Sequence, residues 1–487
     1  MNYSIIVYIL GWILKLEGAF MLLPCIVAVI YREKAGFSFL FVATICLALG
    51  FATSTKRPKN PNMFAREGFV TVALSWIVLS AFGALPFVIN GDIPNYIDAM
   101  FEMVSGFTTT GASILHEVEV LNKCSLFWRS FSHWIGGMGV IVFMLAILPM
   151  TNGSTMHLMR AESPGPSVGK LVPKIRDTAL ILYKIYLVMT VIEFICLVTA
   201  RMPVFDSMLI TFGSAGTGGF GIKNDSMGSY STLQQAIVTI SMILFGVNFN
   251  AYYYLLGKHK KDAFKMEEVR WYFIIIAASI IVISINIRNY FDSFFMAFHQ
   301  AAFQVGSIIT TTGYGTTDFD LWPQLSRSIL VILMFIGACA GSTGGGLKVS
   351  RQLILFKSVK QDMLKFVHPR SVKVMRFDGK AVDKELIRGV SAFFVTYILI
   401  FGISAMVISL DGNDLVTNFT AVAATFNNIG PGLAMVGPTA NFDVFSYFSK
   451  IILIFDMLAG RLELYPILIL FVPSIWKRSR NHKEGKE

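Results

Sequence analysis

Four short glycine-centred segments, about a hundred residues apart, are the part of this sequence best suited to chemistry. Glycine adopts positive φ angles at little cost, so a segment built on it can turn its carbonyl oxygens toward one axis. A ring of such oxygens can replace the hydration shell of a cation. The positions that could bind a cation in this way are Thr109, Thr110, Gly111, Thr217, Gly218, Gly219, Thr311, Thr312, Gly313, Asn428, Ile429 and Gly430.

The third segment, Thr311 to Gly315, reads Thr-Thr-Gly-Tyr-Gly and nearly matches the Thr-Val-Gly-Tyr-Gly loop of potassium channels. The four segments differ from one another, and Pro431 removes an amide from the fourth. We therefore expect a ring of pseudo-fourfold symmetry that selects K⁺ less strictly than a channel does and passes some Na⁺, Rb⁺ or Cs⁺. A tight turn alone explains any single segment, but four in register favour a filter.

Another glycine-rich stretch interrupts the long apolar run 323–366. It holds four glycines in six residues, and glycine costs about 1 kcal/mol relative to alanine inside a helix. The sequence predicts that the helix breaks there into a polar loop beneath the third segment; close helix packing through small residues is the alternative. A phosphate-binding loop is excluded because Leu347 and Val349 interrupt the required Gly-Lys-Ser/Thr ending. The residues of the predicted loop are Gly341, Ser342, Thr343, Gly344, Gly345, Gly346 and Lys348.

The composition is that of a membrane protein. Of the 487 residues, 54% are hydrophobic and 15% are charged, whereas soluble domains carry about 25% charged residues. Four apolar runs are too short to cross a membrane and directly precede the glycine segments, so we expect re-entrant helices at 96–108, 204–215, 292–309 and 414–427. The ten runs predicted to span the membrane are 5–30, 37–55, 68–90, 125–149, 179–200, 232–256, 271–290, 323–357, 390–410 and 445–476.

The predicted fold is an all-α polytopic membrane protein in which four helix–pore helix–filter–helix repeats surround one pore. Most of the 41 Lys and Arg residues fall in loops on one side, which places both termini in the cytoplasm and the glycine segments on the outer side. The N-terminal run is read as a retained helix and not as a signal peptide. The expected parts are an N-terminal two-helix hairpin at 1–65, pore repeats at 66–150, 151–256, 257–366 (with the broken helix) and 367–476, and a basic cytoplasmic tail at 477–487.

Other readings of the sequence are weaker. The net charge of +11 lies mainly in loops without interleaved aromatic residues, which argues against nucleic acid as a partner. Gly216 to Gly221 spells G-x-G-x-x-G, but a short apolar helix precedes it and a polar loop follows, so a dinucleotide site is not expected. His133 and His299 are interpreted as core histidines with satisfied hydrogen bonds. The outer-loop acids could form a cation-attracting vestibule, or be ordinary solvated side chains.

Together, the four segments, Ser132-His133-Trp134-Ile135-Gly136-Gly137-Met138-Gly139, the glycine-rich loop and the stretch around Arg461 resemble the Trk/Ktr/HKT superfamily of potassium transport proteins. Within it, the length and the N-terminal hairpin are most similar to the bacterial TrkH-type subunits. The resemblance implies K⁺ as the transported ion, bound by filter carbonyls, and a multi-pass homodimer in the bacterial inner membrane. It also implies a cytosolic TrkA-type ring that binds the regulatory nucleotide, with no cofactor bound to this chain itself.

The resemblance further implies that the glycine-rich loop is the gate. Arg461 lies within the last apolar run, where a charge costs at least about 2.5 kcal/mol. We expect it to face the pore, contact the carbonyls of the loop, slow cations and help to hold the gate shut. A buried ion pair with Asp456 or Glu463 is the alternative.

The sequence leaves the mode of transport open. Inward conduction of K⁺ is the preferred interpretation, and a proton- or sodium-coupled symporter is the nearest rival, although we find no acid beside the glycine segments except Asp318. A membrane enzyme is the rival of another class; it would need convergent His, Asp or Glu residues, which the sequence does not reveal. The chain is therefore not expected to be an enzyme.

Overall fold

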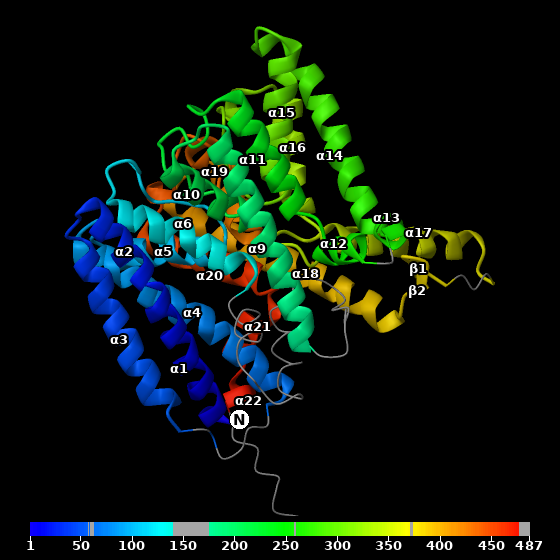
Figure 1. The fold of residues 1–487 in the computed structure, drawn as a ribbon. Helices are drawn as coiled ribbons and strands as arrows, with labels where there is room; N and C mark the ends of the chain where they lie inside the picture. The colour runs from blue at the N-terminus through cyan, green and yellow to red at the C-terminus, as the bar shows by residue number, and fades with distance from the viewer. Residues whose placement is uncertain (57, 59–62, 140–174, 258–259, 371–373, 477–487) are drawn as a thin grey trace, which may run out of the picture.

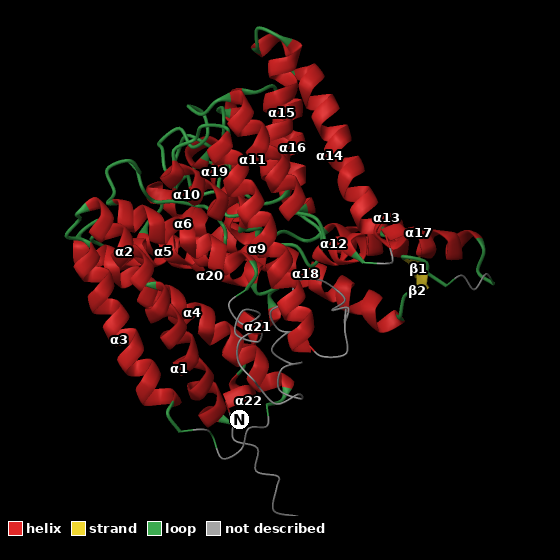
Figure 2. Ribbon diagram, viewed as in Figure 1, coloured by secondary structure: helices red, strands yellow, loops and turns green. Residues whose placement is uncertain are grey.

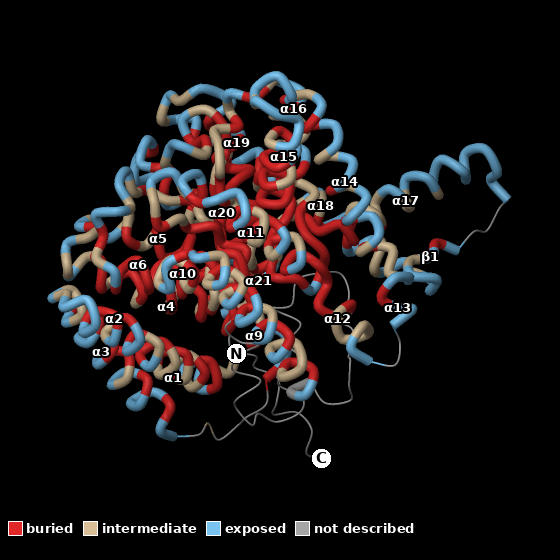
Figure 3. The backbone as a smooth tube through the Cα atoms, turned by 45° about the horizontal axis from the view of Figure 1, so that its top comes forward, coloured by how far each residue is buried: buried red, intermediate tan, exposed pale blue. Residues whose placement is uncertain are grey.

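The computed structural model describes residues 1–487 except 57, 59–62, 140–174, 258–259, 371–373 and 477–487 (Figure 1). The described part is mostly helical (Figure 2). Its small antiparallel hairpin pairs β1 (Arg376–Phe377) with β2 (Lys380–Ala381). Buried residues gather in the middle of the molecule, where the short helices converge (Figure 3). The predicted all-helical class is confirmed.

Six helical segments in the described residues are long and apolar enough to span a membrane. Each coincides with one of the ten predicted runs. They are α1 with α2 (Tyr3–Phe20, Leu22–Tyr31), α3 (Gly36–Ser54), α4 (Ala65–Asn90), α9 (Ile175–Thr199), α14 (Glu267–Asn286) and α18 (Lys384–Ile408).

The four predicted re-entrant helices are present as short apolar helices. Several begin with side-chain caps: Asn95 accepts a hydrogen bond from Ile97 N at 2.8 Å, and Ser293 and Asp414 cap two of the others. Each ends two residues before its glycine segment. They are α5 (Tyr96–Phe107), α10 (Val204–Ala215), α15 (Phe294–Ile309) and α19 (Leu415–Phe426).

Within the described residues, the remaining four predicted spans are not single long helices. Each begins with a helix of 13 to 15 residues after its glycine segment: α6 (Lys123–Gly137), α11 (Thr232–Phe245), α16 (Gln324–Ile336) and α20 (Tyr447–Arg461). At about 1.5 Å per residue such a helix reaches only part of the way across a bilayer. The break between α16 and α17 (Val349–Val367) is the one predicted from the sequence.

Two of the breaks were not predicted, and the expectation of unbroken helices there was wrong. In 232–256, α11 meets α12 (Phe249–Leu256) at 91° because Gly246 ends the first helix and its carbonyl accepts a hydrogen bond from Cys339 N at 3.1 Å. In 445–476, α20 is followed by α21 (Tyr465–Leu468) and α22 (Pro473–Trp476) after two residues with left-handed φ. The end of the run 125–149 lies outside the described residues.

The N-terminal helices stand beside the repeats. Helix α1 packs against α3 and α4, and α4 packs against α5, so the hairpin reaches the first repeat through a spanning helix (Figure 1). On the opposite side, α17 extends away from the core near α13 (Lys260–Lys265) and the β hairpin. The outer half of α17 is exposed (Figure 3).

Candidate functional site

All four glycine segments share one backbone conformation. The first residue of each has a left-handed φ, with 56° at Thr109, 53° at Thr217, 59° at Thr311 and 55° at Asn428. The third residue, always glycine, also has a positive φ, from 76° at Gly219 to 98° at Gly430. A non-glycine residue with positive φ is uncommon and costs free energy, so four equivalent cases indicate a shared constraint. Positive φ at these positions lets the backbone turn so that carbonyl oxygens can point toward one axis.

The four segments also meet in a closed ring, because each glycine faces the main chain of the next segment. The ring follows from where a methyl group on each glycine would lie: 2.1 Å from the Gly218 oxygen for Gly111, 1.9 Å from the Thr312 oxygen for Gly219, 2.0 Å from the Ile429 oxygen for Gly313 and 2.9 Å from the Thr110 oxygen for Gly430. No side chain fits into such spaces. The structure thus brings the four sets of predicted residues together at one level.

The pore helices point their C-terminal ends at this ring. A helix C-terminus carries about half a negative charge, which favours a cation beyond it. The Thr, Asn and Ile side chains of the segments are buried. The arrangement can bind a dehydrated monovalent cation through carbonyl oxygens.

A cavity on the outer side opens onto the four ring glycines, and its lining differs from the acidic vestibule that the sequence suggested. Its charged lining residues are basic: Arg129 and Lys223. Asp320, which is not in the lining, pairs with Arg327 at 3.2 Å and accepts a hydrogen bond from Ala434 N at 3.0 Å. At the rim, hydrogen bonds from Lys450 and His116 lower the pKa of the Asp443 carboxyl.

A buried ion pair, Glu102 with Arg129, supports the first two segments, and the sequence analysis missed it. Glu102 also accepts hydrogen bonds from Ser113 Oγ at 3.0 Å and Ile114 N at 3.1 Å, while Arg129 Nη1 donates to the Gly221 carbonyl at 2.9 Å. Both charges are almost completely buried. The available signal was a charge of each sign inside predicted membrane segments.

Direct hydrogen bonds link the segments to neighbouring repeats. Asn428 Nδ2 donates to Thr110 Oγ1 and to the Met457 carbonyl, both at 2.9 Å, and so connects the fourth segment to the first. The Tyr314 hydroxyl of the third segment donates to the Ile210 carbonyl of α10 at 3.2 Å. These contacts hold the four segments at a fixed spacing although their sequences differ.

The glycine-rich stretch between α16 and α17 passes directly beneath the ring. Gly345 N donates to Thr311 Oγ1, and a methyl group on Gly344 would lie 2.7 Å from the Thr310 carbonyl. Lys348 has φ of 72° and donates from Nζ to the Gly344 carbonyl. The predicted loop residues therefore lie together on the inner side of the third and fourth segments.

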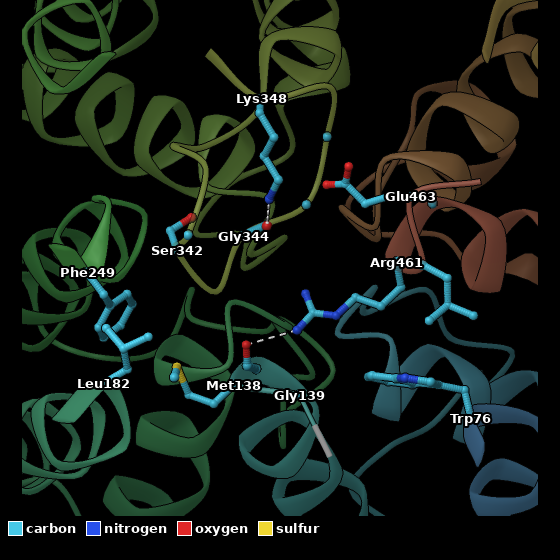
Figure 4. Close-up of a pocket in the computed structure, with 16 residues that line it drawn as sticks. Trp76, Met138, Gly139, Leu182, Phe249, Ser342, Gly344, Lys348, Arg461 and Glu463 are labelled. Atoms are coloured by element: carbon cyan, nitrogen blue, oxygen red, sulfur yellow. Dashed lines mark hydrogen bonds between the residues drawn. The ribbon is translucent and has the colours of Figure 1, made fainter. Parts of the chain in front are cut away.

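Arg461, at the end of α20, joins this loop to the ring. Its Nη1 donates to Thr109 Oγ1 at 3.1 Å and to the Thr343 carbonyl at 2.8 Å, and its Nη2 donates to the carbonyls of Gly136 and Gly137, the latter at 2.9 Å. Figure 4 shows the guanidinium reaching into the inner cavity between Trp76 and the loop. A fixed positive charge thus lies on the inner side of the ring.

The acids considered as partners of Arg461 make other contacts. Glu463 pairs with Arg351 of α17, and Asp456 accepts a hydrogen bond from Ser404 Oγ at 2.7 Å. Glu268 of α14, which is 3% exposed, holds both ends of the loop by accepting hydrogen bonds from Ala340 N and from Ser350 N at 3.1 Å. Glu268 is a second buried acid that the sequence analysis missed.

The two histidines differ in environment. His299 bonds to Gln235 Oε1 at 2.8 Å, as expected of a core histidine. His133 is fully buried, but neither ring nitrogen has a hydrogen-bond partner within the described residues. In that part of the chain, no three His, Cys, Asp or Glu side chains gather as a metal centre would require.

Comparison with known proteins agrees with these features over almost the whole chain. The family model described as TrkH, cation transport protein, matches residues 35–478. The Trk system potassium uptake protein TrkH of Salmonella typhimurium is 38% identical over 98% of this chain and 100% of its own length. TrkG of Escherichia coli is 33% identical over 98% of this chain. The crystal structure of the potassium transporter TrkH from Vibrio parahaemolyticus superimposes with a TM-score of 0.87 at 35% identity, covering 98% of this chain and all of that one.

Proposed function

Because the chain belongs to the TrkH family of cation transport proteins, we propose that it takes up K⁺ across the cytoplasmic membrane. The single observation that carries this proposal is the closed ring of four segments with matching φ angles. Carbonyl oxygens in that ring would replace the water around K⁺. The relatives are named as potassium uptake proteins and not as enzymes, which supports a transporter.

The proposed path has a filter on the outer side and a gate on the inner side. The filter comprises the residues from Thr109, Thr217, Thr311 and Asn428 to their glycines. The gate comprises the loop from Gly341 to Lys348 together with Arg461. The hydrogen bond from Arg461 to the Thr343 carbonyl supports this assignment, since it fixes both the loop and a positive charge on the ion path.

The proposed architecture keeps four pore repeats around one axis and an N-terminal hairpin outside them. In each repeat, the helix that follows the filter is too short to cross the membrane and would occupy only its outer half. We place the chain in the bacterial inner membrane with both termini in the cytoplasm. Its partners would be a second copy of the chain and a TrkA-type cytosolic ring that carries the nucleotide.

Coupled transport is the second candidate. The buried carboxylates Glu102, Glu193 and Asp456 favour it more than the sequence did, because a symporter needs titratable groups inside the membrane. Each of the three has a partner, however: Arg129 neutralises Glu102, Ser214 Oγ of α10 donates a hydrogen bond to Glu193, and Ser404 Oγ of α18 donates one to Asp456. We therefore retain conduction as the proposal.

The deciding experiment is ⁸⁶Rb⁺ uptake into proteoliposomes held at zero membrane potential. Conduction gives uptake only down the Rb⁺ gradient, and an imposed H⁺ or Na⁺ gradient leaves the final level unchanged. Uphill accumulation driven by either gradient would identify a symporter. Absence of uptake above that of protein-free liposomes, with the partner ring present, would contradict the proposed function.

A further inference from the structure

The second filter segment differs from the others at its middle position. Thr110, Thr312 and Ile429 carry side chains there, but the second segment has Gly218. Gly218 is not among the glycines with positive φ, so its backbone conformation is open to any residue. Something other than conformation must require glycine at this position.

The imidazole of His133 occupies the space that a side chain at Gly218 would need. A methyl group on Gly218 would lie 1.8 Å from His133 Nδ1 and 2.2 Å from its Cγ. A methyl group on Gly216 would lie 2.2 Å from the His133 carbonyl oxygen. The Gly-x-Gly pattern that resembles a nucleotide motif is thus explained by the close approach of α6.

Helix α6 backs the rest of the same segment as well. The centroids of the His133 and Phe220 rings are 4.3 Å apart. Arg129, one turn earlier on α6, places its guanidinium carbon 3.8 Å from the centroid of the Phe220 ring. Arg129 also holds the Gly221 carbonyl at 2.9 Å. The segment from Gly216 to Gly221 is therefore shaped against one face of α6.

A histidine is not a general requirement of this helix position. Gly136 of α6 and Gly460 of α20 are equivalent, because each abuts the carbonyl of the last residue of its own pore helix, Phe107 or Phe426. Three residues earlier, α20 has Met457 where α6 has His133. The histidine thus occurs where the neighbouring segment has a glycine to receive it.

We propose that His133 is a positioning residue that sets the cation selectivity of the second filter segment. Protein interiors are closely packed, so the imidazole of His133 prevents the Gly218 carbonyl from moving away from the axis. In the other segments, the middle residue carries its own fully buried side chain. This inference rests on the proposed filter function.

The test is a rescue experiment on the K⁺/Na⁺ permeability ratio in proteoliposomes. His133→Ala alone should lower the ratio several-fold, since it leaves a cavity behind a bare glycine. Gly218→Ala should also lower it, because the new methyl group collides with the imidazole. The double variant His133→Ala/Gly218→Ala should recover most of the wild-type ratio.

Gly219→Ala is the matched control. Its methyl group would lie 1.9 Å from the Thr312 carbonyl oxygen, a clash that removing His133 cannot relieve. His133→Ala/Gly219→Ala should therefore remain impaired. Size-exclusion profiles and melting temperatures of all variants separate a loss of selectivity from a loss of folding.

Two outcomes would overturn the inference: an unchanged ratio in folded His133→Ala, or a double variant with Gly218→Ala no better than Gly218→Ala alone. If Gly218→Ala does not fold, His133→Ala still decides. Failure of the proposed function would give a different result, because the wild-type protein itself would then show no K⁺ flux or no preference for K⁺.

Discussion

Gly313 shows how much a single hydrogen atom matters where four backbones converge. Its φ is 88°, and any Cβ would lie 2.0 Å from the Ile429 carbonyl oxygen. Both constraints act at once: the conformation is unfavourable for other residues, and the Ile429 carbonyl oxygen occupies the space. The same pair of constraints recurs at Gly111, Gly219 and Gly430.

Replacing Gly313 with Ser should reduce the preference for K⁺ over Na⁺ more than it reduces folding. The hydroxymethyl group must displace the Ile429 carbonyl and so enlarge or distort the ring. The permeability ratio of the purified variant measures this effect. Gly379→Ser is a matched control, since Gly379 also has positive φ (75°) but has no atom within 4 Å of its Cβ position. Equal ratios in wild type and Gly313→Ser would remove Gly313 from the filter.

The Glu102–Arg129 pair makes a second residue-level prediction. Removing one member of a buried pair leaves an uncompensated charge and costs about 3–5 kcal/mol. Arg129→Met should therefore lower the melting temperature in detergent strongly. Arg327→Met is the control, because its pair with Asp320 is about one-third exposed and is worth about 0–1 kcal/mol. A similar small effect in both variants would show that the buried pair does not hold the filter together.

At the scale of elements, the short helices that follow the glycine segments leave irregular backbone beneath the ring. Helices α6, α11, α16 and α20 stop beneath the ring, and their last carbonyls become available to other groups. Arg461 uses those of Gly136 and Gly137, while Cys339 N uses that of Gly246. A layer of irregular backbone therefore lies under the filter, where unbroken helices would leave no room for a loop.

Arg461→Ala should raise K⁺ flux, because it removes a fixed positive charge from a low-dielectric path and frees the Thr343 carbonyl. Rb⁺ flux without the partner ring is the measurement. Asp456→Asn, also on α20 but facing Ser404, is the control and should leave flux unchanged. Loss of folded protein in Arg461→Ala would show that this residue serves packing instead.

Deleting Gly344 to Gly346 tests the loop itself. The shortened chain cannot reach across the space beneath Thr310 and Thr311, so flux should no longer depend on the cytosolic partner. Rb⁺ uptake with and without that partner compares the two states. Flux that still rises on adding the partner would place the gate elsewhere.

At the scale of the whole molecule, we expect a separate protein to control the proposed gate. The stretch 358–389, which we expect to lie in the cytoplasm, contains the second half of α17 and a two-stranded hairpin. This is too little for a nucleotide-binding domain. Basic residues in and next to this stretch, among them Lys357, Lys360, Lys365, Arg370, Lys373 and Arg376, are either ordinary positive-inside residues or a docking surface. We favour docking of the cytosolic ring.

Reversing the charges of Lys365, Arg370 and Lys373 should weaken co-purification with the ring and leave the pore dimer intact. Lys365 is exposed and makes only a local contact with Asp362 at 2.8 Å, so its loss should not unfold the chain; Lys373 lies outside the described residues. Lys34→Glu, in the outer loop between α2 and α3, is the control. Undiminished binding at low and high salt would place the docking surface elsewhere.

The sequence alone determined the membrane class, six of the ten predicted spans, the four short apolar helices and the positions of the glycine segments. These features depend on local composition and on conformational preferences of single residues, which are readable along the chain. The loop between α16 and α17 was predictable for the same reason, since glycines in a helix interior carry a known cost. Family resemblance added the expected role of that loop.

Only the tertiary structure decided how these parts contact one another. The bend after Gly246, the Glu102–Arg129 pair and the place of His133 behind Gly218 all join residues that are distant in sequence. The same holds for the basic lining of the outer cavity. The free energy of each contact depends on burial and on the neighbouring residue across the fold. The effect of a buried charge or of a glycine therefore cannot be predicted until that neighbour is known.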